Sequence, residues 1–306
     1  MPSPNIVIFN DTHGWHSQRL VDALAIYRVK VILADLADCM IDFDSSNGLF
    51  IPGLNGRLPD AVIVRGIASG TLEQITLRMD VLHTLAELNI PVLNTAKAIE
   101  HTVDKARTSL RLHLAGINTP RTWACENINK AHDLARRQLK QGHTLVLKPL
   151  FGCQGKGIER ITTLSELEHQ APVGGAFYLQ HYIAPFTPNQ WQDWRLMVID
   201  DKVAAAMSRH SNHWITNFAQ GADCLAATVN KEMTKLALDA AKSVDAAYAG
   251  VDIIRTQDGH YTVLEVNSVP AWKGLQQATG IDIAAQLAKA IINRLTQSKL
   301  TEHAQH

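Results

Sequence analysis

Short apolar runs alternate with helix-like stretches through the first third of the chain. The apolar runs are NIVIFN (5–10), KVILADL (30–36), DAVIVRG (60–66) and IPVLN (90–94). Residues 17–27 and 72–88, which lie between them, repeat their apolar positions with a helical period. Short continuous apolar runs are typical of buried strands, and their alternation with helices indicates β-α-β units. We therefore predict an α/β domain at residues 1–95.

A second module follows at residues 96–175. It opens with a helical stretch from Thr95 that Gly116 and Pro120 bring to an end. Its strand candidates are RTWAC, TLVLKPL and GIERI, with a helix expected at residues 130–141. Thr163 is placed to cap the helix that begins with TLSELEH.

The third module is expected at residues 176–306. It begins near Phe177 with FYLQHYI, and DWRLMVID and KVAAAMSRH then flank a turn at Asp200 and Asp201, which predicts a β-hairpin. A long helix is expected at residues 231–248. The strands AGVDIIRT and HYTVLEVNS follow it.

Charge and composition exclude several classes of protein. The 29 basic and 29 acidic residues balance, so nothing favours a nucleic-acid partner. No apolar run approaches the roughly 20 residues of a membrane-spanning helix, and a basic-then-apolar leader is absent at Met1, so we expect a cytoplasmic protein without a membrane partner. The four cysteines are widely spaced and the fourteen histidines scattered, which argues against a zinc site or a disulfide framework.

The segment KPLFGCQGKG at residues 148–157 predicts a phosphate-binding loop. It does not fit the Walker pattern, because Gly157 leads into a strand-like IERI and no Ser or Thr follows the lysine. A glycine-rich turn between two strands can fold its backbone N–H groups over a polyphosphate as a lid. A flexible hairpin without a ligand is the alternative.

Lys148 ends the apolar strand candidate TLVLK, where burying an ammonium is costly unless it has an anionic partner. This favours a phosphate ligand, although a lysine that extends from a strand end to solvent would show the same pattern. The first turn, NDTHGWHSQ, has no G-x-G-x-x-G, so a dinucleotide site in the first domain has little support. That domain is expected to serve in substrate recognition or docking.

Three oxygen-bearing side chains near the C-terminus are candidate Mg²⁺ ligands. In VLEVNS, Glu265 and Asn267 are two residues apart and therefore share one face of a strand. Asp252, in AGVDII, lies on the expected neighbouring strand. Mg²⁺ prefers such carboxylates together with phosphate oxygens. Solvated polar residues at strand ends are the alternative explanation.

With these residues in place, the chain resembles the ATP-grasp carboxylate-amine ligases, in particular the RimK-like family. The similarity runs from about Thr95 to the C-terminal helix and extends more loosely into the first module. Its motifs are DKARTSLRLHLAGINTPRT, LVLKPLFGCQGKGI, YLQHYI, DWRLMVIDDKVAAAMSRH, TNFAQGA, AGVDII and VLEVNSVPAW. The resemblance implies an ATP-grasp fold of α/β and α+β character, with an N-terminal β-α-β domain before it.

The resemblance also implies roles for individual residues. Lys105 and Lys148 would bind the α- and β-phosphates of ATP, and Asp252, Glu265 and Asn267 would hold two Mg²⁺ ions, with Mn²⁺ as an alternative ion. The other implied ATP-binding residues are Gly152, Gln154, Gly155 and Gly157 in the loop, Gln180, Tyr182 and Ile183 in an adenine-binding hinge, and Asp193. Arg195 and Arg209 would face the γ-phosphate and an acyl phosphate, and Asn217 would support the substrate. The implied reaction activates a carboxylate as an acyl phosphate, which an amine then converts into an amide.

Two segments depart from the common family pattern. Gln180-His181 stands where a glutamate is frequent in relatives, and AWKGLQQATGIDIA follows Pro270 in place of a small-residue PG continuation. That tail, with GWHSQRL and RGIASGTLEQITLRMDVLHTL, resembles the ligases that add glutamate to tetrahydromethanopterin-type carriers. The resemblance implies a small-molecule acceptor and an amino acid as substrates.

Five residues are candidates for contacting that acceptor: Trp15, His16, Arg65, Trp272 and Lys273. Aromatic faces stack on flat heterocycles and cations pair with carboxylates. Trp15 could equally be a hydrophobic staple for the first helix, and Arg65 could be a surface residue.

Other functions stay open at this point. They are modification of a protein C-terminus, synthesis of a dipeptide or glutathione-like product, and a nucleotide-binding regulator without catalysis. The complete set of implied lysines and metal ligands favours an active enzyme. Relatives often form dimers or tetramers, so a homo-dimer or homo-tetramer is an open alternative to a monomer.

Overall fold

A computed structural model describes residues 3–152 and 155–304 of the 306-residue chain. The strands are β1 (Asn5–Phe9), β2 (Lys30–Ala34), β3 (Met40–Ile41), β4 (Leu49–Phe50), β5 (Ala61–Val64), β6 (Val92–Leu93), β7 (Thr122–Cys125), β8 (Leu145–Lys148), β9 (Glu159–Ile161), β10 (Phe177–His181), β11 (Trp191–Ile199), β12 (Lys202–Ser211), β13 (Asp223–Ala226), β14 (Tyr248–Arg255) and β15 (Tyr261–Asn267). The α-helices are α1 (Trp15–Leu24), α2 (Leu72–Glu87), α3 (Ala96–Val103), α4 (Lys105–Leu114), α5 (Ile128–Lys140), α6 (Leu164–Glu168), α7 (Lys231–Ser243), α8 (Lys273–Thr279) and α9 (Ile283–Ala304). Short 3-10 turns lie at Leu36–Asp38, Val173–Gly175 and Phe218–Gln220.

The N-terminal module is a parallel sheet in the order β2-β1-β5-β6. The predicted β-α-β domain is confirmed. All five residues of β1 are buried because both faces of the sheet are covered. Ile6 and Ile8 face a core shared with α1 and α9, whereas Val7 and Phe9 face a core shared with α2 and α3. This two-sided burial explains why the strand is apolar throughout.

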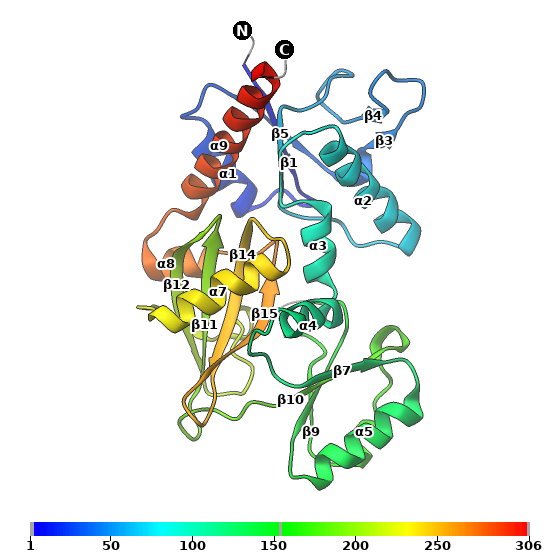
Figure 1. Cartoon of the computed structure of the whole chain (residues 1–306), viewed down its shortest axis with the longest axis vertical. Coiled ribbons are helices and arrows are strands. Elements are labelled where there is room, and N and C mark those ends of the chain that lie inside the picture. The colour runs from blue at the N-terminus through cyan, green and yellow to red at the C-terminus, as the bar shows by residue number, and fades with distance from the viewer. Residues whose placement is uncertain (1–2, 153–154, 305–306) are drawn as a thin grey trace.

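The C-terminal helix α9 corrects the expected domain division. Although it was assigned to the third module, Leu287 and Ile291 pack in the same core cluster as Ile6 and Leu20 of the N-terminal module. Figure 1 shows α9 beside α1 at the end of the molecule where both termini lie. The last helix therefore completes the first module, because the sheet would otherwise leave one apolar face uncovered.

The second sheet has the antiparallel order β7-β10-β8-β9, with α5 and α6 packed against it. The expected boundary before Phe177 is wrong, because β10 lies between β7 and β8 and forms the centre of this sheet. Alternating apolar side chains cannot by themselves say which neighbours a strand will have. The predicted cap is confirmed, since Thr163 accepts from the N–H of Glu166 in a capping box.

The third sheet has the order β13-β12-β11-β14-β15 and is antiparallel. The predicted hairpin is confirmed by the pairing of β11 with β12 across Asp200 and Asp201. One face carries Leu196, Val251 and Val263, which are fully buried against α7. The opposite face of these strands carries the charged residues described below.

Two helix predictions need correction. The helix expected at residues 231–248 ends at Ser243, because Asp245 adopts φ +59° and Tyr248 already belongs to β14. The helical stretch after Thr95 divides into α3 and α4 at Asp104. The Asp104 carboxylate accepts from the N–H groups of Ala106 and Arg107, which starts a new helix with Lys105 as its first residue.

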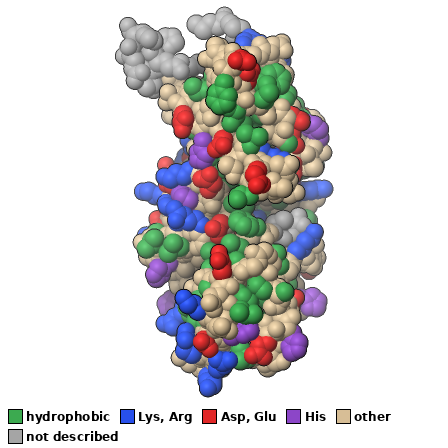
Figure 2. Space-filling view, turned by 90° about the vertical axis from the view of Figure 1, so that its right-hand side faces the viewer, with side chains coloured by type: hydrophobic (Ala, Val, Ile, Leu, Met, Phe, Trp, Pro, Cys, Tyr) green, Lys and Arg blue, Asp and Glu red, His purple; other side chains and the backbone are tan. Residues whose placement is uncertain are grey.

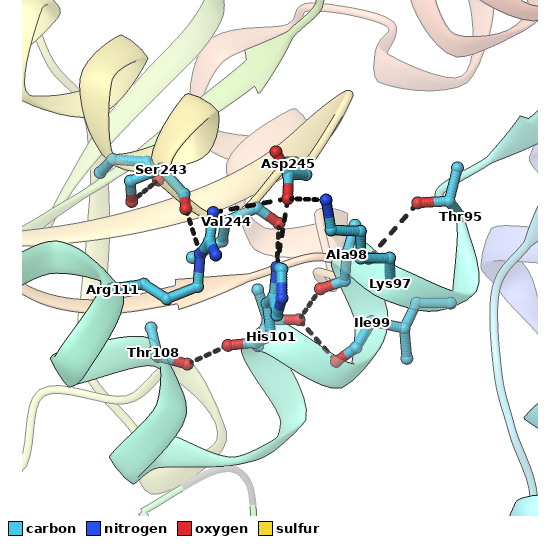
Figure 3. Close-up of polar contacts among 12 residues, drawn as sticks. Thr95, Lys97, Ala98, Ile99, His101, Thr108, Arg111, Ser243, Val244 and Asp245 are labelled. Carbon is cyan, nitrogen blue, oxygen red and sulfur yellow. Dashed lines mark hydrogen bonds and ion pairs between the residues drawn. The ribbon is translucent and has the colours of Figure 1, made fainter. Parts of the chain in front are cut away.

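A cluster around Asp245 joins α3 and α4 to the end of α7 (Figure 3). The Asp245 carboxylate lies 3.1 Å from Lys97 Nζ, 3.4 Å from His101 Nδ1 and 3.5 Å from Arg111 Nη2. Arg111 Nε also donates to the carbonyl of Ser243, the last residue of α7, where carbonyl groups have no partner within the helix. The cluster holds the helix that carries Lys105 against the third sheet.

The surface carries no extended region of one charge on the face that Figure 2 draws, where acidic and basic side chains are interspersed among apolar ones. No helix within the described residues is long and apolar enough to cross a membrane.

We expect Asp245→Asn to lower the thermal midpoint, with a loss of about 1 kcal/mol because Asp245 is exposed. Asn tolerates the positive φ, so this variant removes only the charge, whereas Asp245→Ala should lose about 1 kcal/mol more through backbone strain. Thermal unfolding at low and high salt measures both effects. Equal midpoints for wild type and Asp245→Asn at low salt would contradict the assignment.

Candidate active site

The polar face of the third sheet brings six of the predicted site residues together. Strand pairing sets Asp193 opposite Arg209, Arg195 opposite Asp252, and Asp252 opposite Glu265. Asn267 lies two residues beyond Glu265, opposite Gly250. Directly opposed side chains in a sheet lie on one face, so four neighbouring strands contribute to a single charged surface.

Four of these side chains form a chain of buried ion pairs. Asp252 accepts from Arg195 through Nε and through Nη2, the latter at 2.7 Å. Asp193 accepts from Arg209 through Nε at 2.7 Å and through Nη2. Arg209 Nη2 is also 3.0 Å from Asp252 Oδ2. The alternation of two carboxylates with two guanidinium groups balances the charge of the set.

Burial and pairing shift the pKa values of this set in opposite directions. Burial raises the pKa of Asp193, and Arg209 only partly offsets that effect. Burial also disfavours the ionised form of Asp252, but Arg195 and Arg209 bring its pKa below the usual range. For Arg209, burial opposes the charge, yet Asp252 and Asp193 raise its pKa overall. Asp252 is therefore the more firmly ionised of the two carboxylates, as a metal ligand must be.

Asp252, Glu265 and Asn267 have the chemistry to hold Mg²⁺. Two carboxylates from paired strands and an amide from the same face supply the hard oxygen atoms this ion prefers. Asp252 already has hydrogen-bond partners, because both of its carboxylate oxygens accept from Arg195. The donor set fits the ion.

Two lysines lie near this face, Lys148 at the end of β8 in the second sheet and Lys105 at the start of α4. Lys148 ends β8, and its Nζ donates to Gln180 Oε1 at 2.6 Å. Burial lowers its pKa to about 8; Glu265 and Asp252 act in the opposite direction, while Lys105 adds to the lowering. Lys105 Nζ donates to the carbonyl of Gly152 at 2.7 Å. The two lysines and the carboxylates thus meet where the subdomains face each other.

Gln180 has a role that its predicted place in the hinge did not reveal. Its side chain is buried, accepts from Lys148, and donates to Thr122 Oγ1 and Tyr178 Oη. Tyr178 in turn contacts Ser109 of α4 at 2.7 Å. A glutamine here satisfies the ammonium of Lys148 without adding a negative charge.

The glycine loop reaches the segment that contains Asn217. Gly155 and Gly157 adopt positive φ values of +72° and +69°, which favour glycine. A Cβ on Gly155 would lie 2.8 Å from Asn217 Oδ1 and 2.9 Å from a methyl group of Ile215. Larger residues would therefore collide with this segment. Gln154, predicted to bind ATP, lies outside the described residues.

The expected hinge follows β10. Tyr182 donates its N–H to the carbonyl of Thr144 at 2.9 Å, and Ile183 comes next. The Tyr182 hydroxyl accepts from Trp191 Nε1 at 2.9 Å, and its ring lies edge-on to Trp214, with 6.0 Å between the ring centroids. These contacts hold the segment between the second and third sheets.

Trp272 does not offer the exposed ring that was predicted for substrate contact. It is fully buried. The Arg65 guanidinium lies 4.2 Å from its ring centroid, and the His16 ring is edge-on to it with 4.7 Å between the two ring centroids. Arg65 is also buried, and donates to Tyr248 Oη and to the carbonyl of Pro270. Both predictions need correction, because these side chains join the first and third modules inside the protein.

Of the other predicted substrate residues, His16 and Trp15 are partly buried and Lys273 is exposed. His16 Nε2 accepts from the N–H of Trp272 at 3.1 Å, and burial, with help from Arg65 and Lys273, lowers its pKa to about 4. The imidazole is therefore neutral at pH 7. Trp15 is the first residue of α1 and packs against the apolar core that contains Leu20 and Leu24.

Sequence reasoning missed two residues that support the site. The hydroxyl of Thr216 lowers the pKa of Asp193. Asn94, which is fully buried, donates to the carbonyls of Tyr248 and Ser268. Asn94 is the last residue of the strand candidate IPVLN, and a polar residue at that place is a signal for the end of a strand. Thr216 had no such signal.

We expect Lys148 to titrate near pH 8 because burial disfavours its charged form. Lys105→Met should raise the Lys148 pKa by removing a nearby positive charge, and Glu265→Gln should lower it. The Cε chemical shift in ¹³C-lysine-labelled protein gives these values, with exposed Lys235→Met as the control. A Lys148 that titrates near 10.5 in all variants would contradict the buried environment.

Comparisons with known proteins identify the family. A model of the RimK-like ATP-grasp domain matches residues 102–291. The tetrahydromethanopterin:alpha-L-glutamate ligase of Methanocaldococcus jannaschii is 38% identical over 70% of this chain and 74% of its own length. The protein of the same name from Methanococcus maripaludis is 36% identical over 75% and 78%.

Solved structures share the fold. The ATP-grasp ligase PsnB with its minimal precursor has a TM-score of 0.76 at 21% identity, covering 96% of this chain and all of PsnB. A RimK domain protein from Sphaerobacter thermophilus has a TM-score of 0.69 at 22% identity, covering 94% and 99%. The predicted family, fold class and enzyme class are confirmed. This chain belongs to the RimK-like ATP-grasp family and is an ATP-dependent carboxylate-amine ligase.

Proposed function

We propose that this ligase adds L-glutamate to a tetrahydromethanopterin-type acceptor. The observation that carries the ligase chemistry is the position of Lys148 at the end of β8, where Glu265 and Asp252 raise its pKa against the effect of burial, while Arg195 and Arg209 pair with Asp252. The substrate assignment is supported by the names of the similar ligases from Methanocaldococcus and Methanococcus. A coenzyme gamma-F420-2:alpha-L-glutamate ligase, 27% identical over 87% of this chain, makes an F420-type acceptor the second candidate.

In this proposal the two lysines bind the α- and β-phosphates of ATP. Lys105 is the first residue of α4, so the positive end of the helix dipole adds to the charge of its ammonium group. Gly152, Gly155 and Gly157 leave the loop backbone free to approach the phosphates. The backbone from Gln180 to Ile183 would contact adenine.

Asp252, Glu265 and Asn267 would hold two Mg²⁺ ions, or Mn²⁺ in their place. When bound, the ions would neutralise phosphate charge and polarise the γ-phosphoryl group. Asp252 is shared with Arg195 and Arg209, so the arginines and a metal ion would compete for one carboxylate. Glu265 takes part in no ion pair among the described residues, which leaves it available as a metal ligand.

The reaction joins a carboxylate and an amine in two displacements. A carboxylate oxygen of the acceptor attacks the γ-phosphorus, the bond to the β–γ bridging oxygen breaks, and ADP leaves. The glutamate nitrogen then attacks the acyl carbon, phosphate departs with the C–O electron pair, and the nitrogen loses a proton. Arg195, Arg209 and Asn217 would orient the reacting groups and stabilise the negative charge that develops.

Lys273 remains a candidate for pairing with a substrate carboxylate, since it is exposed at the start of α8. His16, being neutral, would offer a hydrogen bond in place of a charge. Trp272 and Arg65 would act indirectly by holding these residues in place.

The test supplies purified protein with ATP, Mg²⁺, L-glutamate and either tetrahydromethanopterin or F420-2, and reads the product by mass spectrometry. The expected result is a gain of one or more glutamyl units on tetrahydromethanopterin, with equal amounts of ADP. Glutamylation of F420-2 alone would replace the proposed acceptor. No glutamylation of either compound would overturn the substrate assignment.

Replacement of the proposed metal ligand should abolish turnover. We expect Glu265→Ala to lower Mg²⁺-dependent phosphate release by at least about 100-fold, because a lost ligand removes transition-state charge stabilisation of several kcal/mol. Exposed Glu126→Ala is the control and should behave like wild type. Circular dichroism should show both variants folded. Full activity of Glu265→Ala at limiting Mg²⁺ would contradict the assignment.

A further inference from the structure

We infer that Asp193 is a positioning residue that orients Arg209 and the segment bearing Asn217, and does not itself bind nucleotide. The sequence resemblance placed Asp193 among the ATP-binding residues. In the structure it is 2% exposed, and its two oxygens accept from Nε and Nη2 of Arg209. With both carboxylate oxygens engaged inside the protein, it has no face left for a ligand.

The geometry of the Asp193–Arg209 pair fixes the plane of the guanidinium. Arg209 donates through Nε and Nη2 to the two oxygens of Asp193, which is a planar, two-point contact. Arg195 meets Asp252 through the same two atoms. Among the described residues, Nη1 of neither arginine takes part in a hydrogen bond or ion pair. Each arginine thus keeps one nitrogen for a substrate.

Asp193 is the partner that a substrate or metal ion would not displace. Arg209 has a second carboxylate contact with Asp252, but Asp252 is also a proposed metal ligand and already pairs with Arg195. If Asp252 turned to a metal ion, Arg209 would keep its orientation only through Asp193. A buried ion pair contributes little to stability compared with apolar residues of the same size. The Asp193–Arg209 pair is therefore better explained by its effect on the orientation of Arg209 than by a gain in stability.

The hydroxyl of Thr216, which lowers the pKa of Asp193, extends this role to the segment that carries Asn217. Thr216 directly precedes Asn217, whose side chain lies against Gly155 of the glycine loop. Asp193 therefore holds the arginine of β12 and the start of the following segment at the same time. Both elements meet at the polar face where the phosphoryl group would be transferred.

The experiment combines kinetics with a direct view of the guanidinium. Asp193→Asn keeps the shape but removes the charge, and we expect kcat for glutamylation of tetrahydromethanopterin to fall about 100-fold while KM for ATP changes less than about threefold. In the Arg209→Lys background the same substitution should cost less than about threefold, because Asp193 acts through Arg209. Additive losses in the two backgrounds would overturn the inference.

Arginine Nε–Hε signals in ¹⁵N spectra supply a readout that needs no substrate. We expect the slowly exchanging Arg209 signal to be lost in Asp193→Asn and kept in Thr216→Val, which removes only the hydroxyl. The exposed pair Asp133–Arg136 provides the matched control, since Asp133→Asn should leave kcat and the Arg209 signal unchanged. An Arg209 signal that persists in Asp193→Asn would also overturn the inference.

Stability measurements separate positioning from folding. Asp193→Asn should retain the wild-type circular dichroism spectrum, and a variant that does not fold would assign the pair to stability and reject the positioning role. This inference rests on the ligase reaction, and its failure can be told apart from failure of the proposed substrate. Wild type without glutamylation of tetrahydromethanopterin would reject the substrate, while the ¹⁵N experiment would still decide the role of Asp193.

Discussion

The site depends on charges that compensate each other inside the protein. A single buried carboxylate or guanidinium on the third sheet would be very costly, and only their alternation across neighbouring strands makes the polar face tolerable. The opposite face of the same strands is an apolar core against α7. One antiparallel sheet therefore serves both as the support of the module and as the wall of the active site.

The arrangement of the modules follows from a second set of buried polar contacts. Arg65 and His16 of the first module meet Trp272 and Pro270, which come shortly after the proposed metal ligands in the chain. Pro270 also lies 2.9 Å from where a Cβ on Gly250 would be, and Arg195 lies at 3.0 Å from the same point. A shift of the first module relative to the third would therefore move Pro270 and change the packing beside Arg195.

The sequence predicted the elements better than it predicted their neighbours. Apolar period and turn residues located β1, the hairpin of β11 and β12 and the cap at Thr163, because each depends on local geometry. The partners of β10 and the packing of α9 depend on contacts far apart in the chain, which no local pattern encodes. Those two elements account for the misplaced domain boundaries.

The same distinction applies to the site. Strand alternation placed Glu265 and Asn267 on one face, and the pairing with Asp252 agreed with it. The prediction for Trp272 was wrong. An aromatic residue close to the proposed metal ligands can either stack on a substrate or pack in the core, and only its burial distinguishes the two roles. The support that Thr216 gives to Asp193 spans two separate segments and could not be seen before the fold was known.

The packing of α9 also determines the order in which the protein can be completed during synthesis. Strand β1 leaves the ribosome long before α9, yet one of its apolar faces is covered by that helix. Until residues 283–304 emerge, that face stays open, while the second and third sheets can already form their own cores. The N-terminal module can therefore close only after α9 has emerged, and until then Ile6, Ile8 and Leu20 lack part of their core.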